Sequence, residues 1–279
     1  MDARSNRRKA KNTLNRLPAP LRDRLGRFLL RRYEWYEAAR TSDQVTAGAG
    51  ELPVPPPKLR VRVVGHTDLK MFLEAGRKER EIVGRALEAS RIDREPVRIL
   101  DWGCGCGRIL RWWDGLPGLE VNGCDYDPQL VGWVNENLPF AEARVNQLEP
   151  PLPYESGSFD FVYAISVFTH LTEALAIDWM EEILRVLAPG GCFMFTTHGG
   201  SYRDRLDPAE LARFDRGEAV VQFPSTQGSN LCASYFPRQW VQSRLLDGAE
   251  LVELLQPHEM DEADRDTLAQ DRWLIRKPG

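Results

Sequence analysis

The chain has 279 residues, of which 42% are hydrophobic and 28% charged, a composition that can fill the core of one large domain. Its formal net charge of -4 argues against nonspecific nucleic-acid binding by the chain as a whole. No apolar run is long enough to span a bilayer and no apolar signal segment follows the first residues, so we expect a cytoplasmic protein. The five cysteines include no Cys-x-x-Cys pair, which favours reduced thiols over a metal site.

Residues 1–58 differ from the rest of the chain and predict a basic N-terminal extension. Basic residues outnumber acidic residues twelve to four between positions 1 and 40. The first twenty residues are expected to be disordered, and residues 41–58, rich in Gly and Pro, predict a linker. Between them, apolar residues recur at helical spacing, at Leu21, Leu25, Phe28, Leu29 and Tyr36. We expect this helix to pack on the main domain; the alternative is contact with a membrane surface or an acidic partner.

A glycine-rich turn near position 103 is the strongest local signal. Residues 97–101 form a short, mostly apolar run that ends in the acid Asp101, and glycines follow at positions 103, 105 and 107. A helix is predicted next, over residues 107–114. Strand, glycine turn and helix open a nucleotide-binding α/β unit, because glycine lets the backbone approach a ligand. A dinucleotide turn reads Gly-x-Gly-x-x-Gly, and here the third glycine stands one position early.

Three further segments follow the glycine turn in order. A second predicted strand ends at Asp125, about twenty residues past the turn, where an acid can accept hydrogen bonds from both hydroxyls of a ribose. Asp127 and Pro128 are typical of a helix start. Residues 152–163 carry Leu-Pro-Tyr and then Phe-Asp ahead of apolar residues, and residues 184–191 end in Pro-Gly-Gly.

Strands and helices are predicted to alternate through this part of the chain. Strands are expected near residues 97–102, 119–124, 143–146, 159–166, 191–197, 249–255 and 271–276. Helices are expected near residues 73–89, 107–114, 128–137 and 172–187. This alternation implies a parallel sheet with helices on both faces.

The glycine turn and the three segments after it resemble, in order, the motifs of class I S-adenosylmethionine-dependent methyltransferases. The resemblance implies a Rossmann-like, doubly wound α/β domain over residues 59–279, with a seven-stranded, mostly parallel sheet whose last strand is antiparallel. It implies S-adenosyl-L-methionine as the cofactor. The residues that it places at the cofactor are Asp101, Gly103, Gly105, Asp125, Tyr126, Asn146, Gln147, Leu148 and Ser166.

Some of these positions have a specific role in the resemblance. Asp101 would hold the amino end of the cofactor, and Tyr126 would lie against its adenine. Asn146 or Gln147 stands where the family usually has an acid that binds the adenine amine, and an amide can serve there because it both accepts and donates hydrogen bonds. Arginines 60, 62 and 77 are candidates to pair with the carboxylate of the cofactor.

The acceptor side is predicted from the residues that follow the fifth strand. Residues 199–236 contain two short apolar runs and predict an inserted hairpin or cap at the carboxyl edge of the sheet, beside the ligand crevice. His198 precedes the insert and is the candidate general base; the alternative is a structural histidine. Tyr202 and Tyr235 could enclose an acceptor ring.

These features predict an enzyme that methylates an oxygen or a nitrogen of a small-molecule or sugar acceptor. Motifs typical of adenine or cytosine amino methylation, of cytosine C5 methylation and of protein arginine methylation are absent from the sequence. The alternatives are a cofactor-binding scaffold without catalysis and a dinucleotide-dependent oxidoreductase. No nucleic-acid partner, metal or integral membrane association is expected, and the identity of the acceptor and the oligomeric state are left open.

Overall fold

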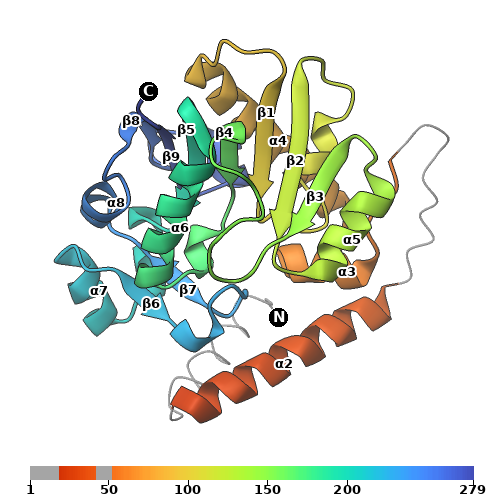
Figure 1. Ribbon diagram of the computed structural model, residues 1–279. Helices are drawn as coiled ribbons and strands as arrows, with labels where there is room; N and C mark the ends of the chain where they lie inside the picture. The colour runs from red at the N-terminus through yellow and green to blue at the C-terminus, as the bar shows by residue number, and fades with distance from the viewer. Residues whose placement is uncertain (1–18, 42–51) are drawn as a thin grey trace.

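A computed structural model describes residues 19–41 and 52–279 (Figure 1). Its centre is a seven-stranded sheet of order β3-β2-β1-β4-β5-β9-β8, in which β9 alone runs antiparallel to its neighbours. The strands are β1 Val97–Trp102, β2 Leu119–Asp125, β3 Ala141–Val145, β4 Phe159–Ala164, β5 Leu187–Thr197, β8 Glu250–Leu255 and β9 Asp271–Arg276. The predicted seven-stranded, mostly parallel sheet is therefore confirmed.

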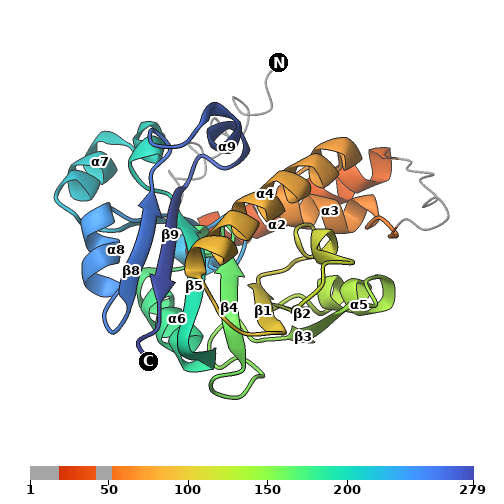
Figure 2. The same cartoon turned by 90° about the horizontal axis from the view of Figure 1, so that it is seen from above.

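Helices cover both faces of this sheet, and Figure 2 shows α4 and α6 on opposite sides of it. Successive strand residues supply two cores, since Ile99 packs into the layer with α4 and α5, whereas Leu100 packs into the layer with α6 and α8. The helices concerned are α4 Leu69–Ser90, α5 Pro128–Asn137, α6 Glu173–Val186, α8 Arg238–Arg244 and, beside α4, α9 Glu262–Thr267.

The structure corrects one element of the sequence analysis, the helix that was predicted over residues 107–114. The structure has only a short 3-10 turn there, η1 Leu110–Trp113. Gly107 has a φ of +75°, which does not occur inside a right-handed α-helix, so the glycine turn continues further than the sequence pattern indicated. The other expected helices and strands occur, with ends that differ by a few residues.

Two segments gather at the carboxyl ends of β1 to β5. The first comprises α2 Ala19–Arg40 and α3 Pro57–Val64, which pack on each other. The helix α3 starts with Pro57 at its first turn, inside the range predicted as a linker, and ends at Gly65 in the left-handed conformation. Disorder was predicted for residues 1–20; residues 1–18 lie outside the described residues, whereas Ala19 and Pro20 already belong to α2, so the prediction is wrong at these two positions. The linker positions 42–51 also lie outside the described residues.

The second segment is the insert after β5. Its elements are η3 Gly200–Arg205, α7 Pro208–Asp215, β6 Val220–Gln222, η4 Pro224–Thr226 and β7 Ala233–Tyr235. The two predicted apolar runs pair as an antiparallel hairpin, β6 with β7. Figure 1 shows this hairpin and α2 along the edge of the molecule to which β1 points. The sheet therefore has its loops, its insert and its N-terminal helices on one common edge.

Candidate active site

The glycine turn is held between β2 and α3. The backbone N–H of Gly105 donates to Oδ2 of Asp125 over 2.9 Å. Gly105 has a φ of +56°, and a Cβ at this position would lie 2.8 Å from Val63 Cγ2 on α3. A side chain is excluded both by this conformation and by the contact, so the turn presents bare backbone beside two buried acids.

Asp101 is the last residue but one of β1, directly before this turn. Its side chain is buried, and burial raises the pKa of its carboxyl to about 7, against the opposing effects of a hydrogen bond with Tyr163 and the charge of Arg108. Oδ2 of Asp101 has no hydrogen-bond partner among the residues that the structure describes. Such a buried acceptor lowers stability unless a ligand donates to it, so this atom is suited to receive a cationic amino group.

Asp125 ends β2, directly beside β1 in the parallel sheet. Its two oxygens accept backbone N–H groups of Gly105 and Asp127, each over 2.9 Å. Burial raises the pKa of Asp125 to about 6, despite these two hydrogen bonds. Each carboxylate oxygen has a second lone pair, so the group can still accept two hydroxyl donors. Tyr126 follows with 48% of its surface exposed, as a ring at the rim of the site.

Asn146 follows β3 and reaches the same edge. Its backbone N–H donates to the carbonyl of Asp125 over 3.1 Å, and its Nδ2 donates to the carbonyl of Gln147 over 2.6 Å. Its buried Oδ1 has no hydrogen-bond partner within residues 19–41 and 52–279. The side chain of Asn146 therefore offers an acceptor to an amine, whereas Gln147 is exposed.

The insert closes against this side of the site. A Cβ at Gly228 would lie 2.5 Å from Leu148 Cδ1 and 4.0 Å from Tyr126 Cε1. The backbone N–H of Gly228 donates to the carbonyl of His170, and the ring of His170 is bonded to the carbonyl of Cys232. The loop between β6 and β7 thus contacts two of the residues that sequence analysis placed at the cofactor.

His198 and two tyrosines form an aromatic cluster at the end of β5. The His198 ring lies 4.1 Å from that of Tyr202 and 5.3 Å from that of Tyr235, centroid to centroid. Nδ1 of His198 lies 3.1 Å from the backbone carbonyl of Ser234. Because a carbonyl only accepts, Nδ1 carries the proton and the lone pair of the neutral ring is on Nε2. The structure therefore brings together the three residues that sequence analysis assigned to the acceptor side.

Ser166 follows β4 and is linked to the aromatic cluster through Gln270, which precedes β9 and is hydrogen-bonded to both Ser166 and Tyr202. Ser166 has a φ of +63°, unusual for a non-glycine residue and typical of functional sites. Its hydroxyl accepts from Nε2 of Gln270 over 2.8 Å. Next to Gln270, Asp271 is buried against Gly199, and burial raises the pKa of its carboxyl to about 6. Sequence analysis missed Gln270 and Asp271. It expected the last strand to be antiparallel, but no local motif shows that the register of β9 against β5 brings Asp271 opposite Thr197 at this edge.

The three candidate arginines have other partners. Arg60 is fully buried and donates to the carbonyls of Pro55 and Thr67, so it anchors the two ends of α3 and is not a candidate for the carboxylate of the cofactor. Arg62 pairs with Asp127 at 3.1 Å, at the start of α5. Arg77 pairs with Glu81 along the surface of α4.

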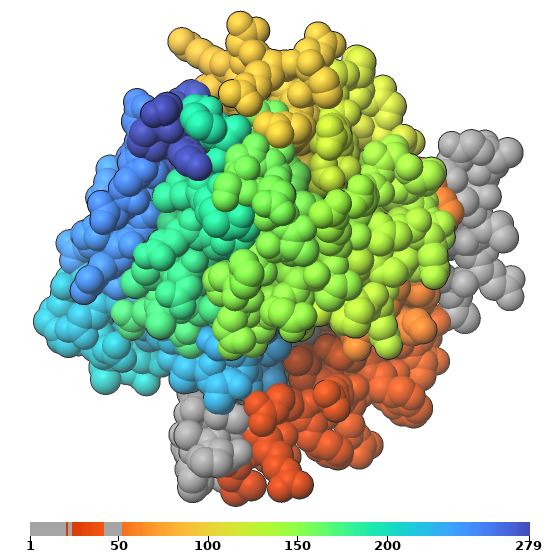
Figure 3. All heavy atoms as spheres, in the orientation of Figure 1, coloured from red at the N-terminus to blue at the C-terminus, as the bar shows by residue number. Residues whose placement is uncertain are grey.

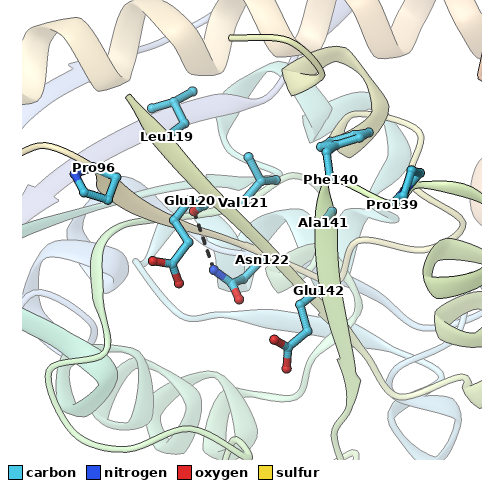
Figure 4. Close-up of a pocket in the computed structure, with 9 residues that line it drawn as sticks. All are labelled: Pro96, Leu119, Glu120, Val121, Asn122, Pro139, Phe140, Ala141 and Glu142. Carbon is cyan, nitrogen blue, oxygen red and sulfur yellow. Dashed lines mark hydrogen bonds between the residues drawn. The ribbon is translucent and has the colours of Figure 1, made fainter. Parts of the chain in front are cut away.

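A separate hollow lies at the amino ends of β2 and β3 (Figure 4). Glu120, Asn122 and Glu142 point into it. The ligand edge of a parallel sheet is the carboxyl edge, where Asp101 and Asp125 lie, so this hollow is not the candidate site.

Comparisons with known proteins agree with this geometry. A family model described as a methyltransferase domain matches residues 100–195. A ubiquinone biosynthesis O-methyltransferase of Xanthomonas oryzae pv. oryzae is 30% identical over 168 residues, which cover 50% of this chain and 69% of that protein. A tRNA N(3)-methylcytidine methyltransferase of Drosophila melanogaster is 26% identical over 155 residues, covering 52% of this chain and 46% of that protein.

A solved structure supports the fold. A SAM-dependent methyltransferase from Methanosarcina mazei superimposes with a TM-score of 0.51 at 18% identity, covering 71% of this chain and 97% of that one. Within the described part of the chain, no helix is both long and apolar enough to cross a bilayer. The matched family, the order of the strands and the acids at the ends of β1 and β2 lead to one conclusion: this chain is a class I S-adenosylmethionine-dependent methyltransferase.

Proposed function

We propose that this methyltransferase modifies an oxygen or a nitrogen of a small-molecule or sugar acceptor that binds against His198, Tyr202 and Tyr235. The observation that carries the proposal is the hydrogen bond from Nδ1 of His198 to the Ser234 carbonyl, which sets the lone pair of the neutral ring on Nε2. The insert, residues 199–236, supplies both tyrosines and acts as a cap over the site.

The cofactor residues take the following roles in this proposal. Oδ2 of Asp101 accepts from the amino group, and Gly103 and Gly105 provide a turn without side chains. The carboxylate of Asp125 accepts from the ribose hydroxyls, and Tyr126 and Leu148 lie on either side of the adenine. Oδ1 of Asn146 accepts from the adenine amine, with Gln147 at the exposed rim. Ser166 lies where the cofactor and the acceptor meet.

The chemistry asks little of the protein beyond positioning. S-adenosylmethionine supplies a methyl group already activated on a sulfonium. The aromatic cluster positions the acceptor. Nε2 of His198 takes the proton of an acceptor hydroxyl as the new bond forms, or the proton that a neutral amine acceptor releases once it has been methylated. Gln270, hydrogen-bonded to Ser166 and to Tyr202, adds a polar group beside the aromatic cluster.

The acceptor class follows from the dimensions and chemistry of the cluster. Two tyrosine rings within 5.3 Å of the histidine ring suit one flat ring or a sugar that offers hydroxyls. The relatives named above include enzymes for a ubiquinone precursor pathway and for tRNA, so both acceptor classes belong in the test.

The test is a screen for S-adenosylhomocysteine production with phenols, amines, sugars and unmodified tRNA. We expect turnover with one class of small molecule and a higher KM for that acceptor in Tyr235→Phe, at unchanged cofactor affinity. Met71→Ala, an exposed substitution on α4, serves as the control. Methylation of tRNA alone would refute the small-molecule assignment.

A further inference from the structure

The helix α2 turns apolar side chains outward. Phe28 is 55% exposed and Trp35 is 72% exposed, although both have large apolar rings. The other exposed apolar residues on this helix are Leu21, Leu25, Leu29 and Tyr36. Large apolar side chains that cluster on one exposed face mark an interaction surface. Sequence analysis predicted that this helix packs on the main domain, and it does pack on α3 and on η4 of the insert, but the apolar stripe faces away from these contacts.

The inward side of α2 is fixed by contacts of a different kind. A Cβ at Gly26 would lie 3.4 Å from Leu231 Cδ1, so the helix approaches the insert closely there. The hydroxyl of Tyr33 donates to the carbonyl of Gly65 over 3.1 Å, at the end of α3. Arg27 donates to the carbonyl of Ser225 in the insert. These contacts set the rotation of α2 about its axis and leave the apolar stripe exposed.

The described charged residues of α2 also divide between its two sides, with basic side chains exposed and acidic side chains turned inward. Among its described side chains, the exposed charged residues are all arginines: Arg24, Arg27, Arg31, Arg32 and Arg40. The acids Glu34 and Glu37 are half-buried on the inward side. Residues 1–40 hold twelve of the 37 basic residues of the chain and only four of its 41 acidic ones, so the rest of the protein is acidic. An anionic surface would therefore attract this side of the protein and repel the others.

We propose that α2 docks the enzyme onto an anionic lipid surface. Leucine, phenylalanine and tryptophan between arginines are the composition of a helix that lies in the membrane interface, where the rings enter the acyl boundary and the guanidinium groups pair with headgroup phosphates. A nucleic-acid surface would use the arginines and leave the apolar stripe without a partner. Figure 3 shows α2 as a protruding ridge along the lower edge of the molecule, accessible to a flat surface.

Docking through α2 would also orient the active site. The helix contacts the insert at Ser225 and Leu231, and the same loop places Gly228 against Tyr126 and Leu148. The edge of the sheet that carries the cofactor and acceptor residues therefore faces the bilayer when α2 is docked. An acceptor that partitions into the interface would reach the cap over a short path.

The experiment is cosedimentation of the full chain with vesicles. Vesicles of phosphatidylcholine and phosphatidylglycerol in equal parts should bind the protein, and pure phosphatidylcholine vesicles should bind it weakly. Each arginine near an anionic surface strengthens binding by about fivefold. Arg24→Glu combined with Arg31→Glu should therefore lower the partition coefficient by more than about tenfold. Phe28→Ser combined with Trp35→Ser should lower it by a similar factor at constant charge.

A matched control distinguishes an effect of the α2 residues themselves from an effect of the change in net charge of the protein. Lys70→Glu combined with Arg77→Glu makes the same charge change on exposed positions of α4 and should leave vesicle binding within about twofold. Affinity for S-adenosylhomocysteine should be equal in all these proteins, which reports on folding and on the methyltransferase site independently. No binding to anionic vesicles, equal loss in the α4 control, or binding of the wild type to tRNA but not to vesicles would each overturn the proposal.

Discussion

Replacement of Asp125 tests the cofactor site most directly. The backbone N–H groups of Gly105 and Asp127 hold both of its carboxylate oxygens in place, so their position in the site is defined. Asp125→Ala removes the acceptor for the ribose hydroxyls. A hydrogen bond to a charged group contributes about 1.5–3 kcal/mol, so loss of two such bonds should weaken binding of S-adenosylhomocysteine by about 3 kcal/mol or more. That loss raises Kd by on the order of a hundredfold. Asp125→Asn keeps one acceptor oxygen and should raise Kd by about tenfold.

Asp125→Asn should weaken cofactor binding, but it should not lower the thermal stability of the free protein. Burial raises the folded-state pKa of Asp125 to about 6, so the carboxyl stabilises the fold most when protonated, and that contribution is lost as the pH rises through 6. At pH 8 the buried charge costs on the order of 2–3 kcal/mol, a cost that asparagine avoids. We therefore expect Asp125→Asn to bind the cofactor more weakly at pH 8 while its Tm stays equal or rises.

Titration calorimetry with S-adenosylhomocysteine and thermal unfolding at pH 8 are the two assays. Asp127→Ala is the matched control, because it removes the N-cap of α5, whose side chain accepts from Gln129, and leaves the Asp125 carboxylate in place. This control should lose about 1 kcal/mol of stability and little affinity. A folded Asp125→Ala protein with unchanged affinity would refute the ribose role.

Two further predictions concern Asp101 and His198. Because burial raises the pKa of Asp101 to about 7, its carboxyl is protonated in much of the free protein at pH 6, and cofactor affinity should rise from pH 6 to pH 8 as the ionised group becomes able to accept from the amino group. Asp101→Asn should flatten this dependence in calorimetry, and a wild-type affinity independent of pH would contradict the role. His198→Ala should lower kcat by about a hundredfold or more at unchanged cofactor affinity, because it removes the proton acceptor. If His198→Ala and the wild type had the same single-turnover rate constant, His198 would not be the base, and positioning of the acceptor would account for the rate.

The sequence predicted the cofactor half of the site because that half is local. A parallel strand places its last residues and the following turn on one edge, so the spacing predicted that Asp101, Gly105 and Asp125 lie close together, and the resemblance to the methyltransferase family implied their roles at the cofactor. The orientation of α2 could not be predicted, because helical spacing identifies an apolar stripe but not which side packs. Here the close approach of Gly26 and the hydrogen bond of Tyr33 determine the inward side.

The acceptor half was only partly predictable for a related reason. His198, Tyr202 and Tyr235 could be proposed because His198 directly follows β5 and both tyrosines belong to the insert after it. Gln270 precedes β9 and Asp271 begins it. The resemblance implied that this last strand is antiparallel, but periodicity does not report its register against β5, which brings both residues to this edge. The turn at Gly107 was misassigned as a helix because the apolar residues after it suit either structure, and the positive φ of that glycine decides between them.

The reversed direction of β9 also bears on the order in which the protein is made and folds. Asp101 and Asp125 belong to neighbouring strands joined by a short connection, so their part of the sheet can close early on a growing chain. The bond between Ser166 and Gln270 spans 104 positions and forms only after β9 has paired with β5. The growing chain can therefore assemble the edge that carries Asp101 and Asp125 first, whereas the contact between Ser166 and Gln270 has to wait until the last strand has been synthesised.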